Sequence, residues 1–194
     1  MQNELRQLQK LIESVRPLSD EDWSAFAGIW KPYSAGRKEV VTPAAQTESY
    51  LYFVTKGIQR VYYLDDQDRE ATLAFMYPPS FGGVVDSLLL GQPSRYYFET
   101  LTPSEFLRAP NQELQALMSH RPAIADMVRL GVTQTLSGIL ERLVEVQCFS
   151  SEEKFRNLLR RSPHILQLVP HKYLANYLGI DATNFSKLVN KIKI

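Results

Sequence analysis

Residues 49–83 read SYLYFVTKGIQRVYYLDDQDREATLAFMYPPSFGG, and this stretch decides the fold of the 194-residue chain. It holds three short runs rich in aromatic and β-branched residues, at 49–56, 58–64 and 70–77. Gly57, the acidic turn 65–68 and a proline pair at 78–79 separate or end these runs. Similar runs lie at 38–42, 95–100 and 104–109. Many short antiparallel strands between turns predict a β-sandwich or a β-roll.

Helical patterns flank these strands. Residues 3–15 form an amphipathic pattern, and Ser19 begins a second helix that Pro32 is expected to end. After the strands, 111–119 is expected to be a short helix, and Pro122 opens a long one over 123–147. A hinge at 148–151 precedes a further helix that Pro163 stops. We therefore predict an α+β chain in three parts: a β-roll of the double-stranded jelly-roll type with N-terminal helices (1–121), a long helix (122–149) and a helix-turn-helix (150–194).

The long helix carries a regular apolar seam. Its members recur at spacings of 4, 3, 4 and 3 residues, as in a coiled coil. One alternative is that this seam packs onto the chain's own β-domain. The strict alternation and the length of the helix favour a partner helix, and hence a homodimer whose interface contains Val132, Leu136, Ile139, Leu143 and Val146.

The C-terminal stretch VPHKYLANYLGIDATNFSKLVNKIKI, residues 169–194, predicts two short helices joined by a tight turn. Gly179 breaks the first helix and Asp181 caps the second. The second helix has an apolar stripe of Phe185, Leu188, Val189 and Ile192, and its other face is small, hydrogen-bonding or basic. A helix-turn-helix needs such a face to reach base edges in the major groove. An ordinary helical hairpin is the alternative.

Charge favours the DNA-binding interpretation. Residues 151–194 hold eight Lys or Arg residues and three acidic residues, a net charge of +5. Residues 1–150 hold 14 basic and 18 acidic residues, a net charge of −4. A basic module at the end of an acidic body suits phosphate binding at that end.

Composition limits the remaining possibilities. The chain is 44% hydrophobic and 22% charged, as expected of a globular protein. It has no apolar run of membrane-spanning length, and its N-terminus is too polar for a signal peptide. A single cysteine, Cys148, excludes a disulfide within one chain. Together these features predict a cytoplasmic protein without a membrane partner.

The order of β-roll, long helix and helix-turn-helix resembles the cAMP receptor protein/FNR (Crp/Fnr) family of transcription regulators. The local matches are the stretch 49–83 and LANYLGIDATNFSKLVNKI at 174–192. The resemblance implies a cyclic-nucleotide-binding-like sensor domain and a homodimer that binds a palindromic operator under the control of an effector. RNA polymerase and a small-molecule effector are further candidate partners.

The segment FGGVVDSLLLGQPSRYYF, residues 81–98, departs from the nucleotide-binding pattern of this family. Members that bind cyclic nucleotides carry Gly-Glu and then Arg followed by Ser or Thr. Here Gly82 matches the glycine, Gly83 replaces the acid, and Arg95 follows Ser94 instead of preceding it. A slip of one residue on a strand sends a side chain to the opposite face. We therefore expect no cofactor, at most weak binding of cyclic nucleotides, and an unidentified effector at a candidate pocket that contains Gly82, Gly83, Ser94 and Arg95. Arg95 is expected in a surface ion pair with Asp86 or Glu99. The alternative is that a shift of the preceding loop lets Arg95 point inward.

The family pattern also suggests roles along the second helix of the helix-turn-helix. Ala182, Thr183 and Lys187 are expected to read bases, and Asn184 and Ser186 to reach bases or phosphates. Phosphate contacts are expected from Lys172, Lys191 and Lys193. The family commonly adds a β-hairpin wing after this helix. Here the wing is either missing, or residues 164–170 (HILQLVP) supply a strand.

Two interpretations from other classes compete with the regulator. The β-roll is also the fold of cupin enzymes, which need histidines on facing strands. His120, His164 and His171 all lie in the helical part and are expected at the surface or at helix ends. Cys148 is expected to be a buried small hydrophobe, and the strand tyrosines to pack in the core or rim. We therefore predict no enzyme, no catalytic residues and no metal site. The other alternative is a sensor module that binds an effector or a protein and has lost DNA binding.

Overall fold

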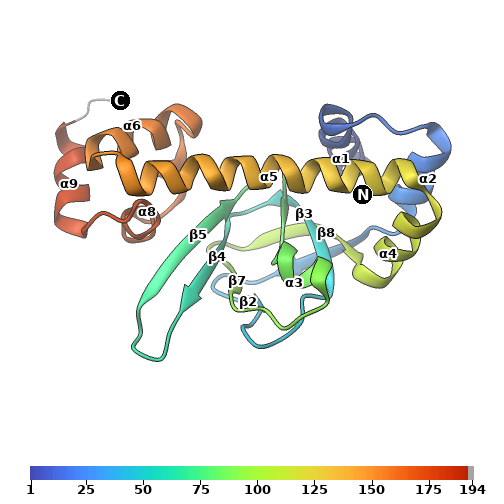
Figure 1. Ribbon diagram of the computed structural model, residues 1–194, viewed down its shortest axis with the longest axis horizontal. Helices are drawn as coiled ribbons and strands as arrows, with labels where there is room; N and C mark the ends of the chain where they lie inside the picture. Colours follow the sequence, from blue (N-terminus) through green and yellow to red (C-terminus); the bar gives the residue numbers. More distant parts are fainter. Residues whose placement is uncertain (192–194) are drawn as a thin grey trace.

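The computed structural model describes residues 1–191, in which one long helix carries a β-roll against its middle (Figure 1). Ile192 and Lys193, for which roles were predicted, lie outside the described residues. The helices are α1 (Gln2–Val15), α2 (Asp20–Gly28), α3 (Val85–Leu90), α4 (Asn111–His120), α5 (Pro122–Cys148), α6 (Ser151–Arg161), α7 (Ile165–Leu168), α8 (His171–Leu178) and α9 (Ala182–Lys191). The strands are β1 (Lys31–Ala35), β2 (Val40–Thr42), β3 (Tyr50–Lys56), β4 (Gln59–Leu64), β5 (Glu70–Met76), β6 (Ser80–Gly82), β7 (Tyr97–Thr100) and β8 (Ser104–Pro110).

Within residues 1–191 the strands form two antiparallel four-stranded sheets, ordered β1-β8-β3-β6 and β2-β7-β4-β5. An aromatic-rich cluster that includes Tyr52, Val61, Phe98 and Phe106 fills the space between the sheets. The register places Arg108 of β8 opposite Tyr52 of β3, and Arg60 of β4 opposite Glu99 of β7. This register decides which charged side chains meet.

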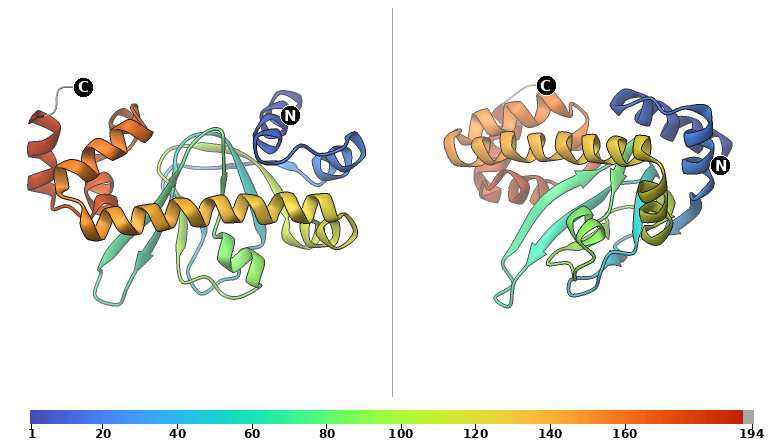
Figure 2. Two further views of the ribbon diagram at one scale, coloured as in Figure 1. Left: turned by 45° about the horizontal axis from the view of Figure 1, so that its top comes forward. Right: turned by 45° about the vertical axis from the view of Figure 1, so that its right-hand side comes forward.

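Helices cover the outer face of the first sheet. Phe53 and Leu107 of that face belong to one buried cluster with Leu8 of α1, Phe26 of α2 and Ile124 of α5. Figure 2 shows α1, α2 and α4 gathered at one end of α5, and the C-terminal helices at the other end. The first third of α5 is therefore a core element, and its later part also contacts the roll, since Arg142 donates to the Leu73 carbonyl oxygen of β5 at 2.6 Å.

The C-terminal helices have a core of their own that also reaches the roll. Phe155 of α6, Leu174 of α8 and Phe185 of α9 are fully buried together. Ile58 and Leu101 of the roll belong to the same cluster. The C-terminal module is thus packed against the β-roll in this structure.

Local sequence explains several element ends. Ser19 caps α2, where its hydroxyl oxygen accepts from the Asp22 N–H at 3.1 Å, as predicted. Ser150 and Glu153 form a reciprocal capping box at α6. Gly57 ends β3 at φ +87°, and a Cβ there would lie 2.5 Å from the Pro103 carbonyl oxygen. Only glycine suits that turn.

Several predicted boundaries differ from the observed ones. The helix after Ser19 ends at Gly28, and Pro32 lies instead in β1. Because β1 is an edge strand, a proline there need not break a hydrogen-bond ladder. Strands β1 and β6 and helix α3 were not predicted. Strand β6 and helix α3 are too short to show a period, and β1 contains Pro32. Residues 164–170 contain helix α7 rather than a strand, so the alternative in which they supply a wing strand is wrong.

Candidate functional site

Helices α8 and α9 are the two short helices that the sequence predicted within residues 169–194, joined by a tight turn. Gly179 takes the left-handed conformation at φ +64° between them, and Ile180 is buried at the corner. Asp181 caps α9, because its Oδ1 accepts from the Asn184 N–H at 2.9 Å. The local geometry at this turn therefore agrees with the pattern read from the sequence.

The outward face of α9 contains most of the residues predicted to meet DNA. Ala182, Thr183, Ser186 and Lys187 are exposed, while Phe185 and Leu188 face the core. The Ser186 hydroxyl donates back to the Ala182 carbonyl oxygen at 2.9 Å. Lys187 and Thr183 are the members of this face best placed to reach a ligand.

The other predicted contacts are partly engaged inside the module. Asn184 is half-buried and its amide donates to the Ser151 hydroxyl at 3.2 Å. Lys191 pairs with Glu152 at 2.8 Å, and this hydrogen bond holds the Glu152 pKa below its usual range. Lys172 is exposed, with its Nζ 4.6 Å from the Tyr173 ring centroid. Asn184 thus points toward α6 rather than outward.

The predicted seam of α5 is exposed to solvent. Leu136, Ile139 and Leu143 are 53%, 59% and 50% exposed, and Val132 and Val146 are also exposed. The chain's own roll therefore does not cover this stripe. Leu140, Val144 and Phe149 widen the exposed apolar surface beside it.

A partly buried ion pair joins the end of α5 to α6 of the C-terminal module. Glu145 receives two hydrogen bonds from Arg161 of α6, at 2.5 and 2.8 Å, and one from Asn157 at 3.1 Å. The Arg161 hydrogen bonds hold the Glu145 pKa below its ordinary value, although burial opposes this. A rotation of α5 would therefore carry α6 with it.

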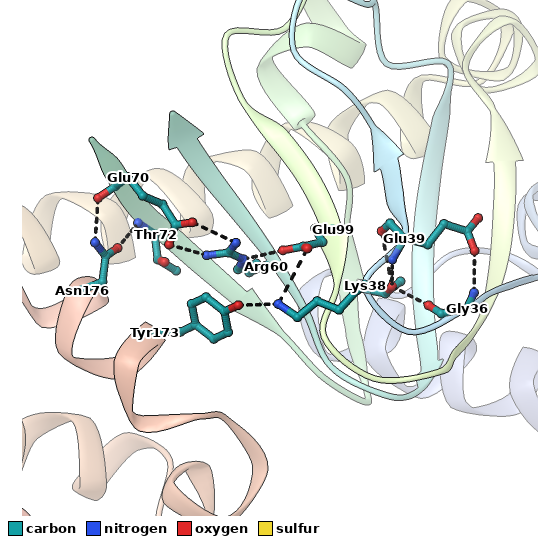
Figure 3. Close-up of polar contacts among 10 residues, drawn as sticks. Gly36, Lys38, Glu39, Arg60, Glu70, Thr72, Glu99, Tyr173 and Asn176 are labelled. Carbon is teal, nitrogen blue, oxygen red and sulfur yellow. Dashed lines mark hydrogen bonds and ion pairs between the residues drawn. The ribbon is translucent and has the colours of Figure 1, made fainter. Parts of the chain in front are cut away.

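A second joint connects the module to the roll, centred on Arg60 (Figure 3). Its guanidinium binds Glu70 at 2.7 and 3.1 Å and Glu99 at 2.7 Å. Its Cζ lies 4.0 Å from the ring centroid of Tyr62 and 4.1 Å from that of Tyr173 on α8. Burial opposes the charge of Arg60, but hydrogen bonds to both carboxylates hold its pKa above the ordinary value.

Further bonds complete this joint. Asn176 of α8 accepts from the Thr72 N–H at 2.5 Å and donates to the Glu70 carbonyl oxygen at 2.6 Å (Figure 3). Because β5 is an edge strand, Asn176 satisfies two backbone groups that would otherwise be unpaired. Lys38 donates to the Tyr173 hydroxyl. Burial alone would raise the pKa of that phenol, but the nearby ammonium groups of Lys38 and Lys172 hold it below its usual range.

The segment that carries the nucleotide-binding pattern in the family is largely closed here. Gly82 is buried in β6, Gly83 follows it at φ +104°, and the buried Ser94 hydroxyl donates to the Tyr96 carbonyl oxygen at 2.7 Å. Arg95 is exposed, as expected of a surface residue. Its predicted ion pair is wrong for Glu99, which is buried and bound to Arg60. No Arg95–Asp86 pair forms within the described residues either.

Glu48 occupies the space beside Gly83, and sequence reasoning missed it. A Cβ on residue 83 would lie 3.3 Å from the Glu48 carboxylate and 3.2 Å from the Tyr52 ring. The carboxylate accepts from the Thr42 hydroxyl at 2.6 Å, the Val84 N–H at 3.2 Å and the Tyr50 N–H at 3.2 Å. Burial raises its pKa, and these hydrogen bonds offset only part of the rise. A carboxylate from the loop between β2 and β3 thus lies beside the position where Gly83 carries no side chain.

A pocket of about 440 Å³ lies between the roll and the long helix. Its walls are mostly apolar and come from both sides: Leu11, Phe81, Leu88, Leu89, Met127 and Val132. This volume is within the roughly 300–1,000 Å³ of small-molecule sites. Because α5 forms one wall, an occupant would contact the helix that leads to the module.

The three histidines and the cysteine, considered above as possible enzyme residues, are all exposed. His120, His164 and His171 are exposed at helix ends, as predicted. Cys148 is exposed, so the prediction of a buried cysteine is wrong. It is the last residue of α5, where no core surrounds it. Across residues 1–191 no cluster of three or more His, Cys, Asp or Glu side chains could hold a metal ion. None of the helices described combines the length and the apolar character needed to cross a membrane.

Comparisons with known proteins identify the fold. Residues 32–121 match the family model of the cyclic nucleotide-binding domain. The structure of FixK2 from Bradyrhizobium japonicum superimposes with a TM-score of 0.75 at 16% identity, over 84% of each chain. A structure from Eubacterium rectale, described as a putative transcriptional regulator of the Crp/Fnr family, superimposes with a TM-score of 0.71 at 14% identity. The match covers 90% of this chain and 83% of that one. The catabolite activator protein of Thermus thermophilus superimposes with a TM-score of 0.57 at 19% identity, over 91% of this chain and 84% of that one. No curated protein matches.

These likenesses confirm the predicted fold class and the resemblance to Crp/Fnr regulators. The chain has a mixed α+β structure, with an antiparallel cyclic-nucleotide-binding-type domain followed by helices, as in those proteins. This is the fold of regulatory proteins of the cyclic nucleotide-binding type. The division at residues 121 and 149 and the contact residues stay predictions.

Proposed function

We propose that the chain is a DNA-binding transcription regulator that acts as a homodimer under the control of an effector. The observation that carries this proposal is the outward face of α9, where Thr183 and Lys187 are exposed on a short helix after a glycine turn. That helix belongs to a module with a net charge of +5 over residues 151–194. Small and basic side chains on such a helix suit base and phosphate contacts in the major groove.

The exposed stripe on α5 supports the homodimer. A row of large apolar side chains at coiled-coil spacing gains by packing against an equivalent row. Two copies joined there would present two α9 helices to the half-sites of a palindrome. The tie between Glu145 and Arg161 would fix each module relative to its dimer helix.

The control step fits a ligand other than a cyclic nucleotide. Glu48 and the loop at Gly83 fill the place where a ribose-binding acid would stand. The apolar pocket lies between the roll and α5, and the joint at Arg60 lies between the roll and α8. An effector that prefers one arrangement of these contacts would shift the module between a docked and a DNA-bound position.

DNA binding is tested by selecting a site from random duplexes and measuring fluorescence anisotropy at several salt concentrations. Lys187→Ala should cost about 1–3 kcal/mol and relax specificity at one position per half-site. Lys191→Ala should weaken binding evenly across sequences and lower the salt slope by about one. Lys10→Ala is the matched control, since it removes one exposed charge from α1 at the far end of the molecule. Unchanged affinity and preference in Lys187→Ala would mean that α9 is not the recognition helix.

The dimer is tested by light scattering at micromolar concentration. Ile139→Glu with Leu143→Glu should give monomers that lose operator binding, because a half-site alone holds weakly. Leu90→Glu is the matched control, since Leu90 is an equally apolar residue on α3 that is 68% exposed and lies outside the stripe. A monomeric wild-type chain would contradict this part of the proposal.

The docking of α8 favours one other candidate function. Tyr173, Asn176 and Tyr177 of this helix contact the roll, as they would in a sensor that keeps its module as a structural part. A wild-type chain with no preference over random DNA, whatever effector is added, would support that sensor-only function.

A further inference from the structure

Arg108 of β8 lies at an open end of the roll's interior and is held by two aromatic rings. Its Cζ is 4.2 Å from the ring centroid of Tyr33 and 4.3 Å from that of Tyr50. Strand register places Tyr52 directly opposite it. Stacking uses the flat faces of the guanidinium, so the N–H groups at its edge stay available for hydrogen bonds.

Residues 1–191 supply no anion to this guanidinium. Among residues 1–191 it forms no ion pair and no side-chain hydrogen bond, although other roll cations such as Lys38, Lys56 and Arg60 are paired. The acids nearby are engaged elsewhere. Glu39 accepts from the Gly36 N–H at 2.5 Å, and Glu48 from Thr42 and Val84. A half-buried positive charge is therefore left for water or a ligand.

A small polar pocket adjoins Arg108. Its volume is about 160 Å³, and the wall beside Arg108 and the tyrosines carries hydrogen-bonding side chains: Thr42, Gln46, Thr47 and Ser49. This space is below the roughly 300–1,000 Å³ of sites for drug-sized ligands, so it is too small for a nucleotide. It suits a carboxylate or phosphate group with few further atoms. Glu48 forms the floor but is 2% exposed, with both carboxylate oxygens covered by donors.

Arg60 in the same roll shows how this chain completes an arginine stacked between two tyrosines. It stacks on Tyr62 and Tyr173 at nearly the same distances and binds the carboxylates of Glu70 and Glu99 at its edge. We infer that Arg108 binds a small oxyanion, namely a carboxylate or phosphate group of a small molecule. Arg60, by contrast, binds two glutamates of its own chain. A planar guanidinium pairs with such groups through two parallel hydrogen bonds.

This site does not depend on DNA binding, and the two proposals therefore fail separately. If the chain is the regulator proposed above, the oxyanion is a candidate for its effector. Its binding would brace β1, β3 and β8, since Tyr33, Tyr50 and Arg108 come from these strands. Arg95, at the position suggested by the family pattern, would have no part in it.

The test is isothermal titration calorimetry of the full chain with acetate, succinate, inorganic phosphate and cyclic AMP in a chloride buffer. At least one of the three small oxyanions should bind saturably and more tightly than cyclic AMP. Arg108→Gln should lower that affinity about ten- to a hundredfold, the size expected for hydrogen bonds to a charged group. Arg108→Lys keeps the charge but lacks the planar fork, so its affinity should be intermediate. Arg95→Gln, which removes an exposed arginine of the same roll, should bind like wild type.

Three results would overturn the proposal. The first is that none of the three small oxyanions binds saturably to wild type. The second is that binding survives in both Arg108 variants, and the third is that Arg95→Gln abolishes it instead. Circular dichroism and thermal unfolding without ligand check that the variants fold. Should Arg108→Gln fail to fold, the comparison of Arg108→Lys with wild type decides the matter.

Discussion

Arg60 and Arg108 lie on opposite sheets of one roll, and each is stacked between two tyrosines. Arg60 sits on the outer face, is 3% exposed and binds two carboxylates. Arg108 sits on the inner face, is half-buried and binds none among residues 1–191. The first arrangement is a closed joint between the roll and α8. The guanidinium edge of Arg108 has no carboxylate partner among the described residues, which explains why we assign a ligand only to Arg108.

The largest expected effect comes from breaking the closed joint. Arg60→Met should lower the free energy of unfolding by about 3–5 kcal/mol, because it leaves Glu70 without its cation and Glu99 with only the Lys38 ammonium at 3.7 Å. Urea unfolding followed by circular dichroism measures it. Adding Glu70→Leu and Glu99→Leu should restore most of the loss, since buried ion pairs are often replaceable by apolar groups. A cost below about 1 kcal/mol for Arg60→Met would show that the joint contributes little.

A smaller effect is expected where the joint meets the edge of the sheet. Asn176→Ala should cost about 1–3 kcal/mol, because the Thr72 N–H and the Glu70 carbonyl lose their partner. Hydrogen exchange should rise at Thr72 and in α8 while β3 stays protected. Asn190→Ala is the matched control, since Asn190 is exposed on α9. Equal exchange in both variants would place the docking free energy elsewhere.

The free energy of unfolding should depend less on Arg108 than on Arg60. Arg108→Met leaves no carboxylate unpaired and removes only two cation–π contacts, so it should cost about 1–2 kcal/mol. The measurement is the same urea titration, with oxyanions absent. A loss as large as that of Arg60→Met would contradict the contrast between the two arginines.

The smallest effect concerns pH at the floor of the open pocket. Burial raises the folded-state pKa of Glu48 above its unfolded value of about 4.3. A carboxyl with a raised pKa holds its proton more tightly when folded, so its contribution to stability is greatest below the unfolded pKa. That contribution is lost as pH rises through the folded pKa. The free energy of unfolding of wild type relative to Glu48→Gln should therefore fall over this window, and a difference that rises with pH would contradict the assignment.

Local sequence predicted the parts of the site that depend on neighbours in the chain. The Gly179 turn, the Asp181 cap and the exposed seam of α5 all involve residues within a few positions or a fixed helical period. Strand β1 and helix α3 were missed, since a proline and a length of six residues hide any period. Asn184 was placed on the outer face by periodicity, but its amide turns toward Ser151 on α6.

The sequence by itself determined which segments are helices or strands, their order and which faces are apolar, because hydrophobic periodicity and capping act between residues that are close in the chain. Only the tertiary structure decided which charges are neutralised. Lys38 meets Tyr173 across 135 positions, and Glu48 takes the place beside Gly83, because strand register and helix docking set those distances. Arg60 and Arg108 are both arginines within strands, and only the packing of distant segments gives one two carboxylates and the other none.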